Sequence, residues 1–359
     1  MNKEVQLENS HFLHGADNTI LIQNNAKVQV QDSTFHLKLE FDSSGISEAN
    51  IYEADVVCND VEKQEVRLLS IDLGSEKGRL ENCQYVLNLS TKDKILTNDY
   101  STEKRSLSLY GLGSYSIIWN KPLKVGPLRM EYNNRLYMNL FPIKSKFCCL
   151  DLEDGRTVWE FQLTDKYNWK DSDDNFFKAT FSKLIGAYDN IVWLVLNSGV
   201  ILGMDAGKGD IRYELCRPNH FEIPEDMKRQ FSDDVNTFNC FTYLDEERGM
   251  LFGTQGEFYW EINLANPTTD FAIYHISSAK DFGIQLNNIG GWKDDQVYFY
   301  EGSDNNHFGV FDRGEKKITQ VYDIPEAKDK FPAIKSMNLF QDKLFIQDHN
   351  TTLHVYSVK

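Results

Sequence analysis

A short signal that returns five times most constrains the fold of this 359-residue chain. Each copy has a turn residue, one further residue, usually an aliphatic residue, and an aromatic residue. The copies begin at Asn134, Asn190, Gly249, Asp295 and Asp342, with spacings of 56, 59, 46 and 47 residues. A second landmark follows each copy after 17, 15, 14, 17 and 15 residues, at Asp151, Asp205, Asn263, Asp312 and Ser357. Because the distance between the two landmarks is nearly the same in every copy, they indicate one repeated unit of about 40 to 60 residues.

Three of the second landmarks continue alike, with a turn former four positions later and an aromatic residue four positions after that. These sets are Asp151, Gly155 and Trp159; Asp205, Gly209 and Tyr213; and Asn263, Pro267 and Phe271. This order predicts the end of a strand, a tight turn, and a next strand with a buried aromatic residue. A repeated unit of short strands is typical of a β-propeller blade.

The segments CLDLEDGRTVW and GMDAGKGDIRY resemble the blade motif of the quinoprotein-like (PQQ-repeat, WD40-like) β-propeller superfamily. That motif has Asp, then Gly four residues later, then Trp four residues after the Gly. The first segment matches it, the second has Tyr213 in place of Trp, and the other copies are degenerate. The resemblance covers residues 127–359, and it implies a fold rather than an activity.

We therefore predict an all-β chain, with residues 1–359 forming a single β-propeller domain of four-stranded antiparallel blades. The repeats are clear over 127–359 and weaker over 1–126, where two or three blades fit. Strands are predicted there at 34–41, 51–57, 66–71, 84–89, 106–112 and 115–119. We predict seven blades, with six and eight as alternatives. Because the last repeat stops after its third strand, we expect an N-terminal strand to complete the final blade.

Charge narrows the classes of partner. The net charge is −16 and the pI is about 5.0, which argues against nucleic acids and anionic membranes, because both are bound through Lys/Arg patches. A basic protein partner fits better. The N-terminus lacks the apolar run of a signal peptide, and the longest apolar run, 191–196, is too short to span a bilayer. We expect a cytoplasmic protein that is monomeric in isolation.

The long connections all run from the outer strand of one blade to the inner strand of the next, at 164–179, 217–238, 277–286 and 325–331. They gather acidic and aromatic residues at one end of the blades. Long loops on a rigid scaffold commonly carry function, and aromatic residues rimmed by charge are frequent binding anchors. The predicted binding residues are Asp165, Tyr167, Trp169, Asp171, Asp173, Asp174, His220, Phe221, Asp226, Asp233, Asp234 and Asp304.

No calcium, phosphate or zinc motif is complete in this sequence. The acidic run at 171–175 begins like a calcium loop, but Phe176 stands where the loop needs glycine. The stretch 203–209 is one residue short of a phosphate-binding loop and lacks the Ser/Thr after its lysine. The histidines form no zinc pair such as HExxH. We predict no catalytic residue, no metal ligand and no cofactor.

The leading hypothesis is a non-catalytic propeller that occludes a basic protein partner through its acidic, aromatic loops. An immunity protein that neutralises a basic toxin would have these properties. The alternative is an enzyme acting on a carbohydrate or another small substrate at the axial mouth of the propeller. A structural propeller within a larger assembly is a third hypothesis.

Overall fold

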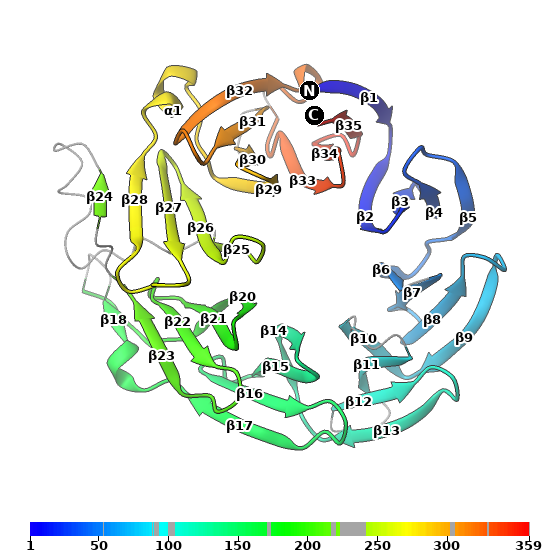
Figure 1. Ribbon diagram of the computed structural model, residues 1–359. Coiled ribbons are helices and arrows are strands. Elements are labelled where there is room, and N and C mark those ends of the chain that lie inside the picture. The colour runs from blue at the N-terminus through cyan, green and yellow to red at the C-terminus, as the bar shows by residue number, and fades with distance from the viewer. Residues whose placement is uncertain are drawn as a thin grey trace. The chain divides into compact units, whose positions relative to one another are not determined.

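The computed structural model of the chain is built almost entirely from β-strands (Figure 1). It describes residues 1–359 except 53, 88, 90–92, 100–104, 171–173, 217–219, 223–241, 302–305, 329 and 359. For residues 220–222 and 255 it describes the backbone alone. Contacts divide the chain into two compact units, Met1–Pro122 with Asn288–Lys359, and Leu123–Asn287.

The first unit contains five antiparallel blades, counted over its described residues. Three follow one another from the N-terminus: β2 (Ser10–Ala16), β3 (Thr19–Asn24), β4 (Lys27–Asp32) and β5 (Leu37–Asp42); β6 (Ile46–Tyr52), β7 (Asp55–Asp60), β8 (Glu65–Ser70) and β9 (Ser75–Glu81); β10 (Cys83–Leu87), β11 (Lys94–Asp99), β12 (Ser106–Gly111) and β13 (Ser116–Lys121). The other two are β29 (Asn288–Lys293), β30 (Gln296–Tyr300), β31 (His307–Asp312) and β32 (Lys317–Asp323), and β33 (Ile334–Phe340), β34 (Lys343–Asp348) and β35 (Leu353–Ser357) with β1 (Asn2–Leu7). The 3-10 helix η3 (Pro325–Ala327) precedes β33.

The second unit contains three blades in its described part. They are β14 (Val125–Tyr132), β15 (Arg135–Leu140), β16 (Lys146–Asp151) and β17 (Thr157–Gln162); β20 (Phe181–Tyr188), β21 (Ile191–Leu196), β22 (Ile201–Asp205) and β23 (Ile211–Leu215); and β25 (Thr242–Asp245), β26 (Met250–Gln255), β27 (Phe258–Asn263) and β28 (Phe271–His275). Between these blades lie η1 (Asp165–Tyr167), β18 (Trp169–Lys170), β19 (Phe176–Phe177) and β24 (His220–Glu222). The helix α1 (Ser277–Phe282) follows β28.

The spacing between the two sequence landmarks is nearly constant because they lie opposite each other on the second and third strands of a blade. Arg135, next to the first landmark, pairs with Asp151, and Ile191 pairs with Asp205 in the next blade. The landmark carboxylate then closes the turn to the fourth strand, since Asp151 Oδ1 accepts the backbone N–H of Glu153 at 2.9 Å. The repeats therefore encode strand register and turn geometry.

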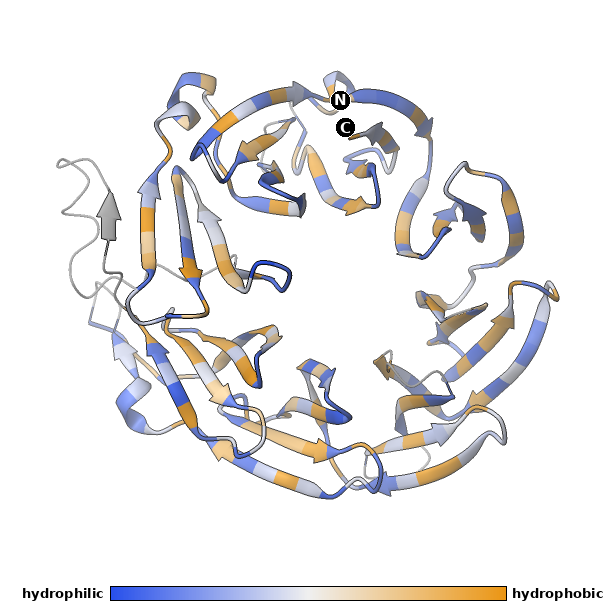
Figure 2. Ribbon diagram, viewed as in Figure 1, coloured by the Kyte–Doolittle hydropathy of each residue, from blue (hydrophilic) through white to orange (hydrophobic). Residues whose placement is uncertain are grey.

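Alternation along each strand supplies a different core to each neighbouring blade. On β3, Ile20 and Ile22 pack with Phe345 of the final blade, whereas Leu21 between them packs with the blade β6–β9. All four of these side chains are fully buried. Figure 2 shows the resulting alternation of hydrophobic and hydrophilic residues along the strands. This period of two is what places apolar layers between blades.

The predicted closure is confirmed. Strand β1 pairs antiparallel with β35, with Asn2 opposite Ser357 and Leu7 opposite Leu353. It covers the edge of β35, which would otherwise expose unpaired backbone groups.

The prediction of seven blades is wrong, because the described residues form eight. The additional blade lies in residues 1–126, which form three blades and carry the weaker repeat signal. The six strands predicted there include none of β2, β3, β4, β9 and β11, and the predicted strand 51–57 spans the turn between β6 and β7. The outer strand β9 (SEKGRLE) is mostly solvent exposed, so its side chains are polar and show no apolar alternation.

Candidate binding surface

The longest described connection in the second unit is the strap, which we define as residues 163–180 between β17 and β20. It begins with η1 and continues into the two-stranded hairpin β18–β19. Trp169 pairs with Phe177 and Lys170 with Phe176 in this hairpin. In Figure 1 it lies in the green segment around the label β18. The strap thus has secondary structure of its own, although it joins two blades.

The first anchor of the strap is Tyr167. Its side chain is buried, and its hydroxyl donates a hydrogen bond to Glu214 Oε2 on β23 at 2.9 Å. The Lys166 ammonium group pairs with the same oxygen at 2.7 Å. Burial, together with the Glu214 carboxylate, raises the pKa of Tyr167, so the hydroxyl keeps its proton and remains a donor at neutral pH. Tyr167 therefore holds the strap against the next blade and does not face solvent.

The second anchor is a pair of asparagine side chains. Asn168 accepts the backbone N–H of Ala179 at 2.9 Å and so ties the two ends of the strap together. Asn197, in the turn between β21 and β22, accepts the N–H of Thr180 at 2.8 Å. The backbone N–H of Phe181 then donates to the carbonyl of Lys144, in the turn between β15 and β16, at 3.0 Å. These bonds fix the strap to turns of both blades that it connects.

The anchored strap presents apolar rings to solvent. Trp169 stacks on Phe177 with a centroid distance of 4.6 Å. Phe176 is 62% exposed and Phe177 is 38% exposed. In the adjacent β15–β16 turn, Phe141 and Ile143 are also about half exposed. Large apolar side chains gathered at one end of a blade are typical of an interaction surface.

The charges of the strap are mixed in its described part. Asp165 accepts a hydrogen bond from Asn168 Nδ2 at 3.0 Å, and Asp174 pairs with Lys170 at 3.0 Å. Lys166 and Lys178 add positive charge. An exposed pair such as Lys170–Asp174 contributes about 0 to 1 kcal/mol to stability, so these carboxylates remain accessible to a partner.

The remaining predicted binding residues are largely outside the described residues. His220 and Phe221 lie on β24, whose backbone pairs in parallel with β28 as a fifth strand of that blade. The others, Asp171, Asp173, Asp226, Asp233, Asp234 and Asp304, fall in the ranges that the structure does not describe. The acidic character of this end of the blades stays a prediction.

Sequence reasoning identified the strap but missed its exposed large apolar side chains. Phe176 and Phe177 were not selected, although adjacent aromatic residues in a loop carry a usable signal: a strand points consecutive side chains to opposite faces, so burying both is difficult. Phe141, Ile143 and Glu214 had no comparable signal, because their roles depend on which segments meet in the fold.

The described residues hold no group of three or more His, Cys, Asp or Glu side chains placed to bind a metal ion. Nor does any described helix have the length and apolar character needed to cross a bilayer.

Comparison with known proteins identifies the fold. No family model and no curated protein matches the sequence. Among solved structures, BamB from Moraxella catarrhalis is similar over 99% of both chains, with a TM-score of 0.60 and 10% identity. Sqt1 from Saccharomyces cerevisiae is similar over 99% of both chains (TM-score 0.63, 8% identity). The C-terminal WD40 domain of Sif2 matches over 99% of this chain and 98% of that one (TM-score 0.65, 10% identity). The protein is a β-propeller similar to quinoprotein-like and WD40 propellers, which confirms the resemblance predicted from its repeats.

Proposed function

We propose that this propeller binds a protein partner with a basic surface, and that the strap is the centre of the contact. The observation that carries the proposal is the exposed pair Phe176 and Phe177 on a strap fixed by buried and backbone hydrogen bonds. Exposed rings on an anchored segment bind at low entropic cost, because little ordering is needed on association. Aromatic residues also supply a large share of the binding energy at protein interfaces.

The charge of the chain supports a basic partner. With a net charge of −16, the protein attracts a basic surface at long range, and this attraction mainly speeds association. The sequence places Asp171, Asp173 and Asp174 between Trp169 and the two phenylalanines. In the proposed contact, these carboxylates pair with Lys and Arg of the partner while the rings exclude water.

More specifically, we propose that the propeller acts by covering the working surface of its partner. A protein that covers the working surface of a basic partner, as an immunity protein covers a toxin, needs a rigid scaffold and a binding surface but no chemistry of its own. The proposed setting is the cytoplasm, with the propeller monomeric until it meets its partner.

A paired pull-down tests this proposal. The parent protein and the double variant Phe176→Ala/Phe177→Ala are used as baits in native lysate, and captured proteins are compared by quantitative mass spectrometry. A matched control, Ile117→Ala/Ile118→Ala, removes two exposed side chains of similar exposure from the outer strand β13. We expect a basic protein whose recovery falls at least about tenfold with the strap variant, and with added salt, but not with the control. Equal capture by all three baits would reject the strap as the binding surface.

A further inference from the structure

Lys183 is a basic residue at the junction of two blades in the second unit. It lies on β20, the first strand of its blade, at a point where the strand register shifts between Phe181 and Lys183. Its ammonium nitrogen lies over the ring of Tyr243, 4.3 Å from the centroid, and Tyr243 belongs to β25 of the next blade. Register shifts of this kind redirect side chains and are frequent next to functional sites. The lysine therefore reaches across to the neighbouring blade.

The surroundings of Lys183 are apolar. Ile185, two residues further along β20, packs against the core between the same two blades, and Tyr243 stacks on Phe252 with a centroid distance of 5.8 Å. The Lys183 side chain is itself half-buried. Its nitrogen is not one of the fully enclosed polar atoms that lack a partner in the described residues, so it reaches solvent. The amine is thus open to a small molecule at an apolar junction.

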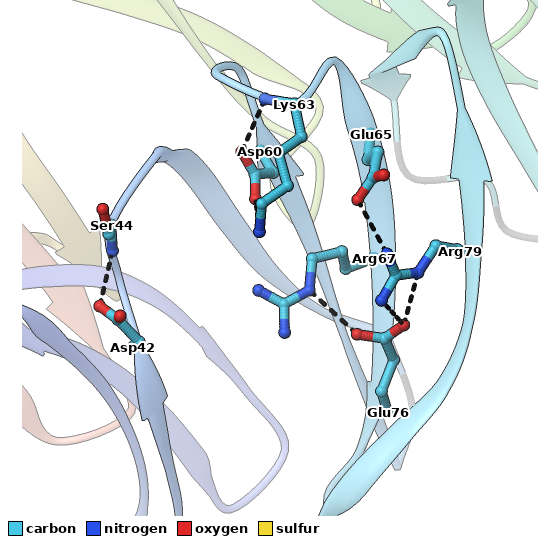
Figure 3. Close-up of polar contacts among 8 residues, drawn as sticks. All are labelled: Asp42, Ser44, Asp60, Lys63, Glu65, Arg67, Glu76 and Arg79. Carbon is cyan, nitrogen blue, oxygen red and sulfur yellow. Dashed lines mark hydrogen bonds and ion pairs between the residues drawn. The ribbon is translucent and has the colours of Figure 1, made fainter.

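Lys183 has no counterion among the described residues. No charged group acts on its pKa, which burial lowers to about 8. The blade β6–β9 shows the more usual arrangement, in which Arg67 and Arg79 direct their guanidinium groups at Glu76 at 3.2 and 2.7 Å (Figure 3). Burial without such a carboxylate partner favours the neutral amine.

A lysine in this state is a nucleophile. At pH 7 its free-amine fraction exceeds that of a lysine with an ordinary pKa by a factor on the order of 100. Desolvated lysines are the ones that form imines with carbonyl compounds. The surroundings also favour the product, because an imine is less basic than the amine it replaces and so places less charge in an apolar site.

We propose that Lys183 binds a small aromatic aldehyde covalently, as an imine whose aromatic ring lies against Tyr243. The lone pair of the amine nitrogen forms a bond to the carbonyl carbon, and the carbonyl π electrons move to the oxygen. Two protons pass from nitrogen to oxygen, the C–O bond breaks, and water leaves as the C=N bond forms. Nothing is oxidised or reduced in this step.

The aromatic class follows from the contact with Tyr243. A flat ring attached to the new C=N bond can stack on the tyrosine ring, whereas an aliphatic chain gains only apolar contact there. The inference goes beyond the proposed function, because it concerns a small molecule and not a protein partner.

Reductive trapping tests the site in the intact protein. Benzaldehyde is added at pH 7 with sodium cyanoborohydride, which reduces an imine to a stable amine, and peptide mass spectrometry measures the labelling rate of each lysine. Lys280, exposed on α1 in the same unit, is the internal control. We expect Lys183 to be labelled at least about tenfold faster than Lys280. Labelling of Lys183 at the rate of Lys280, or more slowly, would overturn the proposal.

The role of Tyr243 is tested by comparing benzaldehyde with propanal. The ratio of the two labelling rates at Lys183 should exceed the same ratio at Lys280 at least about fivefold. Tyr243→Phe keeps the ring and should keep this preference, whereas Tyr243→Leu should abolish it. No preference in the parent, or a preference that Tyr243→Leu leaves intact, would show that the ring does not form the site.

Competitive acetylation with trace acetic anhydride tests the state of the amine independently of any aldehyde. The acetylation rate of Lys183, measured by mass spectrometry at a series of pH values, should level off above about pH 8, where the amine has lost its proton. A rate that keeps rising up to about pH 10 would show an ordinary lysine and would overturn the proposal.

Discussion

The three blades formed from residues 10–121 and the three blades of Leu123–Asn287 share one strand order, yet they differ at the connections between blades. In the first set, β5 and β6 are separated by residues 43–45 and β9 and β10 by residue 82 alone. In the second set, β17 and β20 are separated by the strap. The connections of the first set are thus too short to form a hairpin, whereas the strap of the second set forms one and exposes Phe176 and Phe177.

In the proposed function, stability and binding are assigned to separate parts of the chain. Strand ladders and interblade cores recur in both sets, so they define the scaffold. The described part of the strap adds no strand to a blade. Its Leu163, Tyr167 and Ala179 belong to a buried core cluster, whereas Phe176 and Phe177 are exposed, so removing those two rings should cost little stability. The following predictions test this separation, from the largest expected effect to the smallest.

Deleting residues 1–7 should have the largest effect on stability. The deletion removes β1 and exposes the backbone edge of β35, which should lower the free energy of unfolding by about 3 kcal/mol or more. Urea denaturation followed by circular dichroism measures this. The control Lys3→Ala removes only exposed contacts, to Glu326 and to Gln6, and should change stability by less than about 1 kcal/mol. A deletion variant as stable as the parent would show that β1 does not complete the blade.

Trp159→Ala should lower the stability of the fold nearly as much as deleting residues 1–7. The indole N–H of Trp159 donates to the carbonyl of Ala206 in the next blade at 3.0 Å, and its ring lies against Gly209, where a Cβ would come within 2.6 Å of the ring. Loss of this buried ring should lower the free energy of unfolding by about 3 to 5 kcal/mol. Trp159→Phe keeps most of the packing and should cost less. Equal effects of the two substitutions would mean that the hydrogen bond, and not the packing, dominates.

Asp348→Asn should change how stability depends on pH. Burial is the largest single influence on Asp348 and raises its pKa, but the His354 imidazole at 2.8 Å and the backbone N–H groups of Thr352 and Asn350 outweigh it and lower the pKa. A lowered folded-state pKa contributes stability above the unfolded pKa, and that stability is lost as the pH falls through the folded value. The variant should be less stable than the parent by about 1 to 3 kcal/mol at pH 7.

The stability difference between parent and Asp348→Asn should narrow below about pH 4, where the parent carboxylate takes up its proton. Thermal unfolding across the range from pH 3 to pH 7 measures it. Asp281→Asn, at an exposed position on α1, is the control and should show no such narrowing. A difference that is independent of pH would contradict the assigned role of the charge.

Tyr167→Phe should have the smallest effect on stability, about 0.5 to 1.5 kcal/mol, because it removes one hydrogen bond to Glu214. The substitution should also loosen the strap without affecting the blades. Amide hydrogen exchange should become faster in the strap and stay unchanged in β22, which lies in the interior of the neighbouring blade. Unchanged exchange in the strap would show that Tyr167 is not its anchor.

The sequence predicted the blade topology well wherever its signals had a geometric cause. Arg135, beside Asn134, pairs with Asp151, so strand register fixes the distance between the two landmarks, and β1 pairs with β35 to complete the final blade. The number of blades was predicted wrongly because the repeat signal is weaker over residues 1–126, where outer strands such as β9 also carry no apolar pattern.

The candidate site could be predicted in position but not in detail. An insertion between blades marks the strap, and Trp169, a predicted binding residue, lies on its strand β18. Tyr167 was predicted as a binding residue, but its partner Glu214 lies 47 residues away, so only the fold shows that the ring is buried. The exposure of Phe176 likewise depends on how the hairpin is anchored.

The most direct test of the separation between scaffold and binding surface is to measure Phe176→Ala/Phe177→Ala twice, once by urea denaturation and once by calorimetric titration with the basic partner recovered in the paired pull-down. We predict a change in the free energy of unfolding below about 1 kcal/mol and a loss of affinity of about 30-fold or more. An affinity equal to that of the parent, or a loss of stability as large as the loss of binding energy, would contradict the account.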